Sequence, residues 1–192
     1  YDMVIRDWSS DVCSSDLRPG AFRGAAGHRR GPMNGDAPGK HRLFFALPVK
    51  PETTSTLVGF MGELGRFGRE LKIVPRDNFH ITLKFLGSVQ DDTCRGLVKS
   101  LSETPLPEGA IPFRMTGTGA FPGMSRPSVL WIGFDVDRGR VETLFRVIEN
   151  LAASHGFEPE GRDFVPHLTI ARVRERNRPS RELIDLLKRN RE

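Results

Sequence analysis

Two short segments share one pattern, and they constrain the fold of this chain more than any other feature. Residues His80-Ile81-Thr82-Leu83 and His167-Leu168-Thr169-Ile170 both have the order histidine, apolar, threonine, apolar. Alternation with a period of two is typical of a β-strand that has one buried face. Each segment therefore predicts a strand with an imidazole and a hydroxyl on one face and two buried side chains on the other.

The segments around these two strands alternate between strand-like and helix-like patterns. Short apolar runs predict strands over residues 42–49, 71–74, 78–86, 111–120, 128–136 and 163–173. Apolar residues at helical spacing predict helices over residues 51–67, 91–104, 139–155 and 180–191. Helices separated by hairpin-like strand pairs favour an α+β layered fold over a doubly wound parallel sheet.

The first forty residues differ from the rest of the chain. They are rich in glycine, proline and serine and show neither strand nor helix periodicity. Residues 7–17 look like a translated sequencing adapter fused in frame to a gene. We therefore expect a disordered arm over residues 1–40, a fusion artefact up to about residue 32. The folded domain is then expected over residues 41–192.

Composition excludes several classes of protein. The two cysteines, Cys13 and Cys94, are too few for a disulfide framework and form no zinc-binding CxxC pair. The sequence has no apolar run long enough for a bilayer, no secretory apolar core and no glycine-rich nucleotide loop, so we expect a cytoplasmic protein without a membrane segment or cofactor. The net charge is +5, and its surplus in residues 176–192 fits a solvated helix as well as a nucleic-acid groove.

Two imidazoles presented in this way suit acid–base chemistry at neutral pH. Their ordinary pKa of about 6.5 allows one ring to be neutral while the other is protonated. Cleavage of a phosphodiester needs a base at the attacking oxygen, an acid at the leaving oxygen and donors to the other phosphate oxygens. The threonine hydroxyls can be those donors. No metal is required; a metal shared by two histidines alone is the poorer alternative.

With these motifs the sequence resembles the 2H phosphoesterase superfamily, and within it the RNA 2′,3′-cyclic phosphodiesterases, also called 2′-5′ RNA ligases. Three runs carry the resemblance, at residues 42–47, 78–87 and 166–172. It implies two lobes of antiparallel sheet with outer helices around a central cleft. It also implies hydrolysis of RNA or nucleoside 2′,3′-cyclic phosphate ends to 2′-phosphomonoesters without a metal or cofactor.

The resemblance also implies roles for the motif residues. His80 is expected to be the proton donor and His167 the proton acceptor, while Thr82 and Thr169 bind the phosphate oxygens. Arg172 is a further candidate substrate contact. Five residues separate it from His167, so strict alternation puts it on the opposite face, and only a β-bulge or a strand end would bring it to the motif face.

Other residues leave alternatives open. Lys84 fits either a phosphate contact or a solvated strand position, and Phe44 and Phe121 fit either the core or a stacking site for a terminal base. We expect the remaining histidines to be structural or incidental; they are His28, His41 and His155.

The resemblance also bears on the end of the domain and on partners. The family continues beyond the second motif with further strands, so we expect the C-terminal strands to be missing here. The expected partners are RNA 3′ ends or small cyclic nucleotides, bound by a monomer. The alternatives are the reverse reaction, 2′-5′ RNA ligation, and a non-catalytic module that binds RNA ends.

Overall fold

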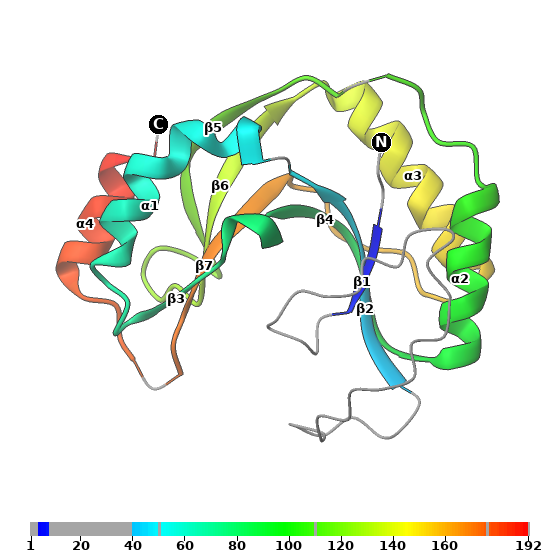
Figure 1. Ribbon diagram of the computed structural model, residues 1–192, viewed down its shortest axis with the longest axis horizontal. Coiled ribbons are helices and arrows are strands. Elements are labelled where there is room, and N and C mark those ends of the chain that lie inside the picture. The colour runs from blue at the N-terminus through cyan, green and yellow to red at the C-terminus, as the bar shows by residue number, and fades with distance from the viewer. Residues whose placement is uncertain (1–3, 8–39, 50, 110, 176, 192) are drawn as a thin grey trace. The chain divides into compact units, whose positions relative to one another are not determined.

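The computed structural model describes residues 4–7, 40–49, 51–109, 111–175 and 177–191 (Figure 1). The strands in these ranges are β1 Val4–Asp7, β2 Lys40–Pro48, β3 Leu71–Ile73, β4 His80–Gln90, β5 Phe113–Phe121, β6 Val129–Val136 and β7 His167–Val173. The helices are α1 Val58–Gly65, α2 Asp91–Glu103, α3 Arg138–Ser154 and α4 Arg181–Arg189. Two short 3₁₀ segments cover Pro51–Leu57 and Arg76–Asn78.

The strand pairs whose registers are defined are all antiparallel, and the predicted α+β class is confirmed. Two segments differ from the prediction. The helix expected from residue 51 begins as the 3₁₀ segment, where three β-branched threonines lower α-helix propensity. Residues 163–166 do not join β7, since Pro166 has no N–H to donate to a neighbouring strand.

The prediction of an N-terminal arm stays a prediction. Residues Val4–Asp7 form β1, which pairs with β2 so that Val4 is opposite Ala46 and Asp7 is opposite Leu43. Residues 8–39, which contain most of the adapter-like sequence together with Cys13 and His28, lie outside the described residues.

The chain divides into two compact units, which we describe separately. The first takes the described residues up to 47 and those within 83–109 and 139–164; it contains β1, β2, the later part of β4, α2 and α3. The second takes the described residues within 48–82, 111–138 and 165–191. It contains the beginning of β4, then β7, β6 and β5 as successive neighbours, with β3 also paired to β7.

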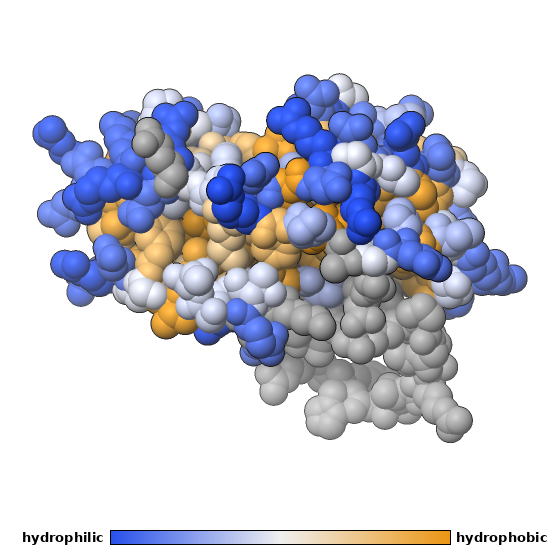
Figure 2. All heavy atoms as spheres, turned by 90° about the horizontal axis from the view of Figure 1, so that it is seen from above, coloured by the Kyte–Doolittle hydropathy of each residue, from blue (hydrophilic) through white to orange (hydrophobic). Residues whose placement is uncertain are grey.

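In the second unit, α1 and α4 cover one face of the strands (Figure 1). The end of α4 is fixed there by Thr118 of β5, whose hydroxyl donates to the Leu187 carbonyl at 2.6 Å. A Cβ atom on the preceding residue, Gly117, would overlap the backbone of Arg191, so this close approach requires glycine. Figure 2 shows hydrophilic side chains at the left of the view, the side of α1 and α4, as expected for solvated helix faces.

The core of each unit is apolar and lies beneath its helices. In the first unit it includes Phe45 of β2, Leu97 of α2 and Ile148 of α3, all completely buried. Removing such side chains from water is the main favourable term in folding. Among the described helices, none combines the length and apolar composition that a bilayer span requires.

Candidate active site

The two motifs lie on neighbouring strands of the second unit. β4 and β7 pair antiparallel, with Ile81 directly opposite Leu168. Both of these side chains are buried, at 8% and 0% exposure. The face that they share is the one covered by the helices, because Leu168 is also paired with Ile132 of β6, which in turn is opposite the α4-bound Thr118.

The register places the four polar motif residues on the other face. In an antiparallel pair, one step forward on one strand meets one step back on its partner. His80 therefore comes opposite Thr169, and Thr82 comes opposite His167. All four side chains are partly exposed. The fold thus gathers two imidazoles and two hydroxyls on one strand pair, away from the core.

Each histidine is oriented by the backbone carbonyl two residues before it. Nδ1 of His80 is 2.7 Å from the Asn78 oxygen, and Nδ1 of His167 is 2.8 Å from the Val165 oxygen. Because a carbonyl can only accept, Nδ1 is the donor in both rings. Nε2 is then the nitrogen of each imidazole that exchanges a proton in a reaction.

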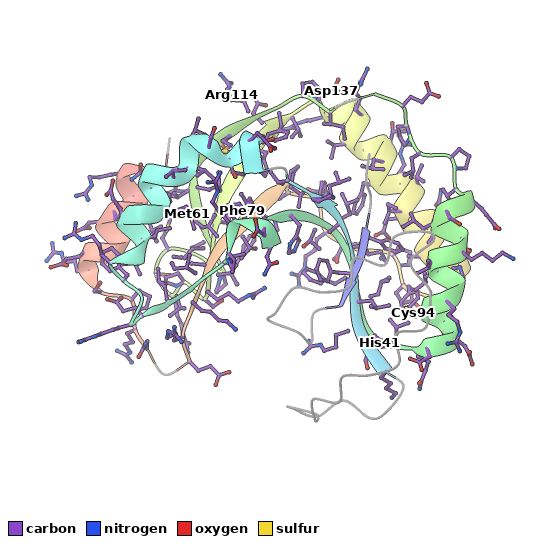
Figure 3. The ribbon with its side chains drawn as sticks, in the orientation of Figure 1. His41, Met61, Phe79, Cys94, Arg114 and Asp137 are labelled. Atoms are coloured by element: carbon purple, nitrogen blue, oxygen red, sulfur yellow. The ribbon has the colours of Figure 1, made fainter. Side chains whose placement is uncertain are left out.

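The local sequence fixes these carbonyls. Asn78 ends the 3₁₀ segment, and the next residue, Phe79, is buried at 1% exposure within the second unit (Figure 3). Before the second motif, Pro166 restricts Val165 to extended backbone. The backbone just before each histidine therefore holds the carbonyl that orients its ring.

Two aromatic rings lie beside the second histidine. The ring centroid of His167 is 5.0 Å from that of Phe121 in an edge-to-face arrangement and 6.1 Å from that of Trp131. Burial lowers the pKa of His167 below its ordinary value of 6.5, against the smaller opposing effect of the hydrogen bond to Val165. His167 is therefore predominantly neutral at pH 7.

Two glycines make room for Trp131. Gly119 of β5 is directly opposite Trp131, and a Cβ atom there would overlap the indole ring. A Cβ atom on Gly133 would lie 3.3 Å from the same ring and 2.5 Å from the Thr116 hydroxyl. The absence of these two side chains lets the indole lie across the strands, next to His167.

Arg172 lies on the motif face because β7 contains a bulge. On β6, Trp131 is opposite Thr169, whereas Val129, two residues earlier, is opposite Arg172. β7 thus has one more residue than β6 between these pairs, and the register shift lies between Leu130 and Trp131. Since Trp131 and Val129 point to the same side of β6, their partners share that face too. The structure contains the bulge that this placement of Arg172 required.

Lys84 fits neither of its two sequence-based interpretations. Its ammonium group lies in the first unit, 2.8 Å from a carboxylate oxygen of Glu149 and 2.8 Å from the carbonyl of Glu158. The Lys84 and Glu149 side chains are only 4% and 13% exposed. This buried ion pair explains why an apolar strand tolerates a lysine. The ammonium group of Lys84 donates to Glu149 and Glu158, so it does not serve as a phosphate contact.

The two phenylalanines left open by the sequence have different places. Phe44 is 5% exposed and belongs to the core of the first unit. Phe121 is 37% exposed and lies against the His167 ring in the second unit. Of the two, only Phe121 is placed to contact a molecule bound at the motif face.

The other described histidines make structural contacts in the first unit. Nε2 of His41 lies 2.7 Å from a carboxylate oxygen of Asp91, and Nε2 of His155 lies 2.8 Å from the Ser100 hydroxyl (Figure 3 labels His41). Cys94 on α2 is a buried cysteine. Within the described ranges, no cluster of three or more histidine, cysteine, aspartate or glutamate side chains is arranged to hold a metal ion.

The sequence analysis missed Trp131 and the two glycines that accommodate it. A local signal exists, since Trp131 and Gly133 have the same parity in a predicted strand. That signal does not say which strand is adjacent, and only the pairing of β6 with β7 brings Trp131 beside Thr169.

Comparison with known proteins agrees with this arrangement. The model of the family described as LigT like Phosphoesterase matches residues 47–131 and 135–192. The chain belongs to the LigT-like phosphoesterase family. This membership confirms the resemblance found in the sequence and the fold class that it implied.

Relatives of this LigT-like phosphoesterase include two proteins named RNA 2′,3′-cyclic phosphodiesterase. The one from Aeropyrum pernix is 36% identical over 122 residues, which are 63% of this chain and 67% of the relative. The one from Aquifex aeolicus is 36% identical over 110 residues, 56% of this chain and 57% of the relative. The crystal structure of TT0787 from Thermus thermophilus is similar with a TM-score of 0.59 at 26% identity, covering 72% of this chain and 77% of that one.

Proposed function

We propose that this protein is a metal-independent RNA 2′,3′-cyclic phosphodiesterase that hydrolyses cyclic phosphate ends of RNA or nucleosides to 2′-phosphomonoesters. The observation that carries the proposal is the shared face of β4 and β7, where two imidazoles with the same tautomer lie beside two threonine hydroxyls. The names of the relatives from Aeropyrum pernix and Aquifex aeolicus support the same activity.

His167 is the base in this proposal. Its Nε2 takes a proton from a water molecule as the water oxygen forms a bond to phosphorus. A general base has to be neutral to accept a proton, and the lowered pKa of His167 supports that role at neutral pH. The hydrogen bond from Nδ1 to Val165 holds the ring in the tautomer that this step needs.

His80 is the acid on the other side of the phosphate. It enters the reaction as imidazolium, and its Nε2 gives a proton to the 3′ oxygen as the bond from phosphorus to that oxygen breaks. The 2′ oxygen keeps its phosphate, which gives the 2′-phosphomonoester. One proton is taken up at His167 and one released at His80, so exchange with solvent restores both rings.

The two hydroxyls and Arg172 bind the phosphate. Thr82 and Thr169 donate to the non-bridging oxygens, on which negative charge increases in the transition state. Arg172 lies on the same face and adds a positive charge beside the phosphate. With the 5′ hydroxyl of a second RNA in place of water, the same groups in the same roles would join the two ends by a 2′-5′ bond, which is the alternative of 2′-5′ ligation.

The test is turnover of adenosine 2′,3′-cyclic phosphate in excess chelator, with the product identified by its phosphate position. We expect the wild-type protein to give the 2′-phosphate. His80→Ala and His167→Ala should each lower kcat/KM by about 10²- to 10⁴-fold, the usual effect of one general acid or base. His41→Ala is the matched control, since His41 pairs with Asp91 within the first unit, and its activity should be unchanged.

Each other result contradicts a stated part of the proposal. Activity that disappears with chelator contradicts metal independence. Full activity in both motif variants rules out the two-histidine mechanism. Binding of the cyclic nucleotide without any turnover favours the alternative of a module that binds RNA ends.

A further inference from the structure

We infer that Trp131 is a positioning residue for His167: its indole fixes the orientation of the imidazole, and Gly119 and Gly133 leave the space in which the indole lies. This inference rests on the proposed function, because it concerns the histidine that acts there as the base. It adds a requirement to that mechanism. The base needs a rigid aromatic neighbour from another strand to keep its Nε2 aimed at the attacking water.

The strand register brings the indole to the imidazole. Gly133 of β6 lies directly opposite His167 of β7. Trp131, two residues before Gly133, lies on the same face of β6 and is directly opposite Thr169. Its ring centroid is 6.1 Å from that of His167, with the ring planes at 57° to each other. Since Gly133 has no side chain, the indole is the side chain of β6 that lies beside the imidazole.

Three contacts restrict the indole itself. A Cβ atom on Gly119, the β5 residue opposite Trp131, would overlap the indole ring, and one on Gly133 would lie 3.3 Å from it. The Phe121 ring packs against the indole with the two centroids 5.3 Å apart. The indole thus lies against the backbone of two glycines and against a second aromatic ring. Close packing of this kind holds a side chain in one rotamer, so the imidazole has a rigid neighbour.

The hydrogen bond to Val165 does not fix the imidazole by itself. It holds Nδ1 of His167 at 2.8 Å from the carbonyl oxygen but leaves the ring able to swing about that contact. The indole limits this motion from β6, and the Phe121 ring does so from β5. The orientation matters because a misplacement of about 1 Å at a reacting group can cost about 10²-fold in rate.

Two features of this arrangement are unfavourable for stability. Glycine inside a strand weakens the strand, and β5 and β6 contain Gly119 and Gly133 beside the indole. Among the described residues, the buried Nε1 of Trp131 has no hydrogen-bond partner, a cost that a phenylalanine ring would avoid. Stability alone therefore favours other side chains at these positions, whereas a role at His167 accounts for all three residues.

The experiment measures turnover of adenosine 2′,3′-cyclic phosphate by three variants. Trp131→Ala removes the indole, and we expect kcat to fall by about 10- to 100-fold while KM stays within about 3-fold, because the groups that bind the phosphate are kept. Trp131→Phe keeps a flat ring, so its kcat should stay within about 3-fold of the wild-type value. Gly119→Ala adds a methyl group that displaces the indole, and it should repeat the loss seen in Trp131→Ala.

A double variant and a control sharpen this test. Without an indole to displace, Gly119→Ala should cost nothing further, so its combination with Trp131→Ala should have the kcat of Trp131→Ala alone. Gly62→Ala is the matched control. Gly62 is an exposed glycine of α1, on the other face of the same unit, and an added Cβ there has no described atom within 4 Å. Both kcat and KM of this control should be unchanged.

Nuclear magnetic resonance of the free protein gives a measurement that does not depend on turnover. Three-bond couplings to Cγ of His167 report its χ1 rotamer, and they are independent of the ring currents that disappear with the indole. We expect the couplings of a single rotamer in the wild-type protein, in Trp131→Phe and in Gly62→Ala. Averaged couplings are expected in Trp131→Ala and Gly119→Ala.

The outcomes separate this inference from the proposed function. An unchanged kcat in both Trp131→Ala and Gly119→Ala overturns the positioning role while the cyclic phosphodiesterase activity stands. A Trp131→Phe variant as slow as Trp131→Ala shows that the ring alone is not sufficient, and losses that multiply in the double variant show that Gly119 does not act through the indole; either result overturns the inference. Should Trp131→Ala fail to fold, as judged by circular dichroism, Gly119→Ala decides. A wild-type protein without turnover overturns the proposed function, and the couplings then decide whether Trp131 orients His167.

Discussion

The two copies of the motif share a local geometry but differ in their surroundings. His80 and His167 both donate from Nδ1 to the carbonyl two residues earlier, at 2.7 and 2.8 Å. Beyond that, His167 packs against Phe121 and Trp131, and burial lowers its pKa. A repeated local sequence thus makes two similar imidazoles, and the neighbouring strands give one of them the property of a base.

The strands that carry the copies also differ. β4 is a long strand of eleven residues, and its later part belongs to the first unit, where Lys84 is buried against Glu149. β7 is seven residues long, has partners along both edges and contains the bulge that brings Arg172 to the motif face. The second copy of the motif therefore has more functional neighbours, with the aromatic rings of Phe121 and Trp131 beside its histidine and Arg172 at the end of its strand.

The largest expected effect tests whether the two histidines act as a unit. If acid and base work in the same step, the double variant of His80→Ala and His167→Ala should be about as slow as the slower single variant, about 10²- to 10⁴-fold below wild type in kcat/KM. Steady-state rates of all three variants on a cyclic mononucleotide measure this. Losses that multiply in the double variant would mean that the two rings act independently.

A smaller effect is expected at the threonines. Thr82→Val and Thr169→Val keep the side-chain shape but remove a donor to a charged oxygen, which is worth about 1.5–3 kcal/mol, or about 10- to 150-fold in kcat/KM. Because Thr82 and Thr169 have equivalent positions in the two copies of the motif, we expect the two variants to lose kcat/KM by similar factors. Thr143→Val is the control, because the Thr143 hydroxyl donates to a carbonyl within α3. Full activity in either motif variant would show that only one copy binds the phosphate.

The smallest effect concerns pH and is specific to the second copy. Because burial lowers the pKa of His167 below its ordinary value of 6.5, the base becomes protonated at a lower pH than a free imidazole, and the acidic limb of kcat/KM should lie below pH 6.5. Phe121→Ala exposes the His167 ring and should raise its pKa, which moves the acidic limb to higher pH. As the pH falls, the variant should therefore lose activity before the wild-type protein does. Phe85→Ala, at an exposed position of the first unit, is the control. An acidic limb above pH 6.5, or one unmoved in Phe121→Ala, contradicts this account.

Much of the fold could be predicted because strand and helix periodicity are local. The alternation around His80 and around His167 placed both motif strands, and the apolar spacing in residues 91–104 and 139–155 matched α2 and α3 closely. The 3₁₀ segment at Pro51–Leu57 was missed, since apolar spacing beyond it predicted a continuous helix. Local patterns identify the type of an element better than its turn-by-turn geometry.

The sequence by itself determined which groups the site contains: two histidines, each before an apolar residue and a threonine, with the turn and proline that orient their rings. Only the tertiary structure decided what surrounds them. Strand pairing placed Trp131 beside His167, and a bulge in β7 turned Arg172 toward the motif face. Pairing of β3 with β7 placed Lys72 opposite Arg172. A buried ion pair with Glu149 holds Lys84 in the first unit. Side-chain direction follows from local alternation, but register and contacts depend on residues far apart in the chain, which no local pattern contains.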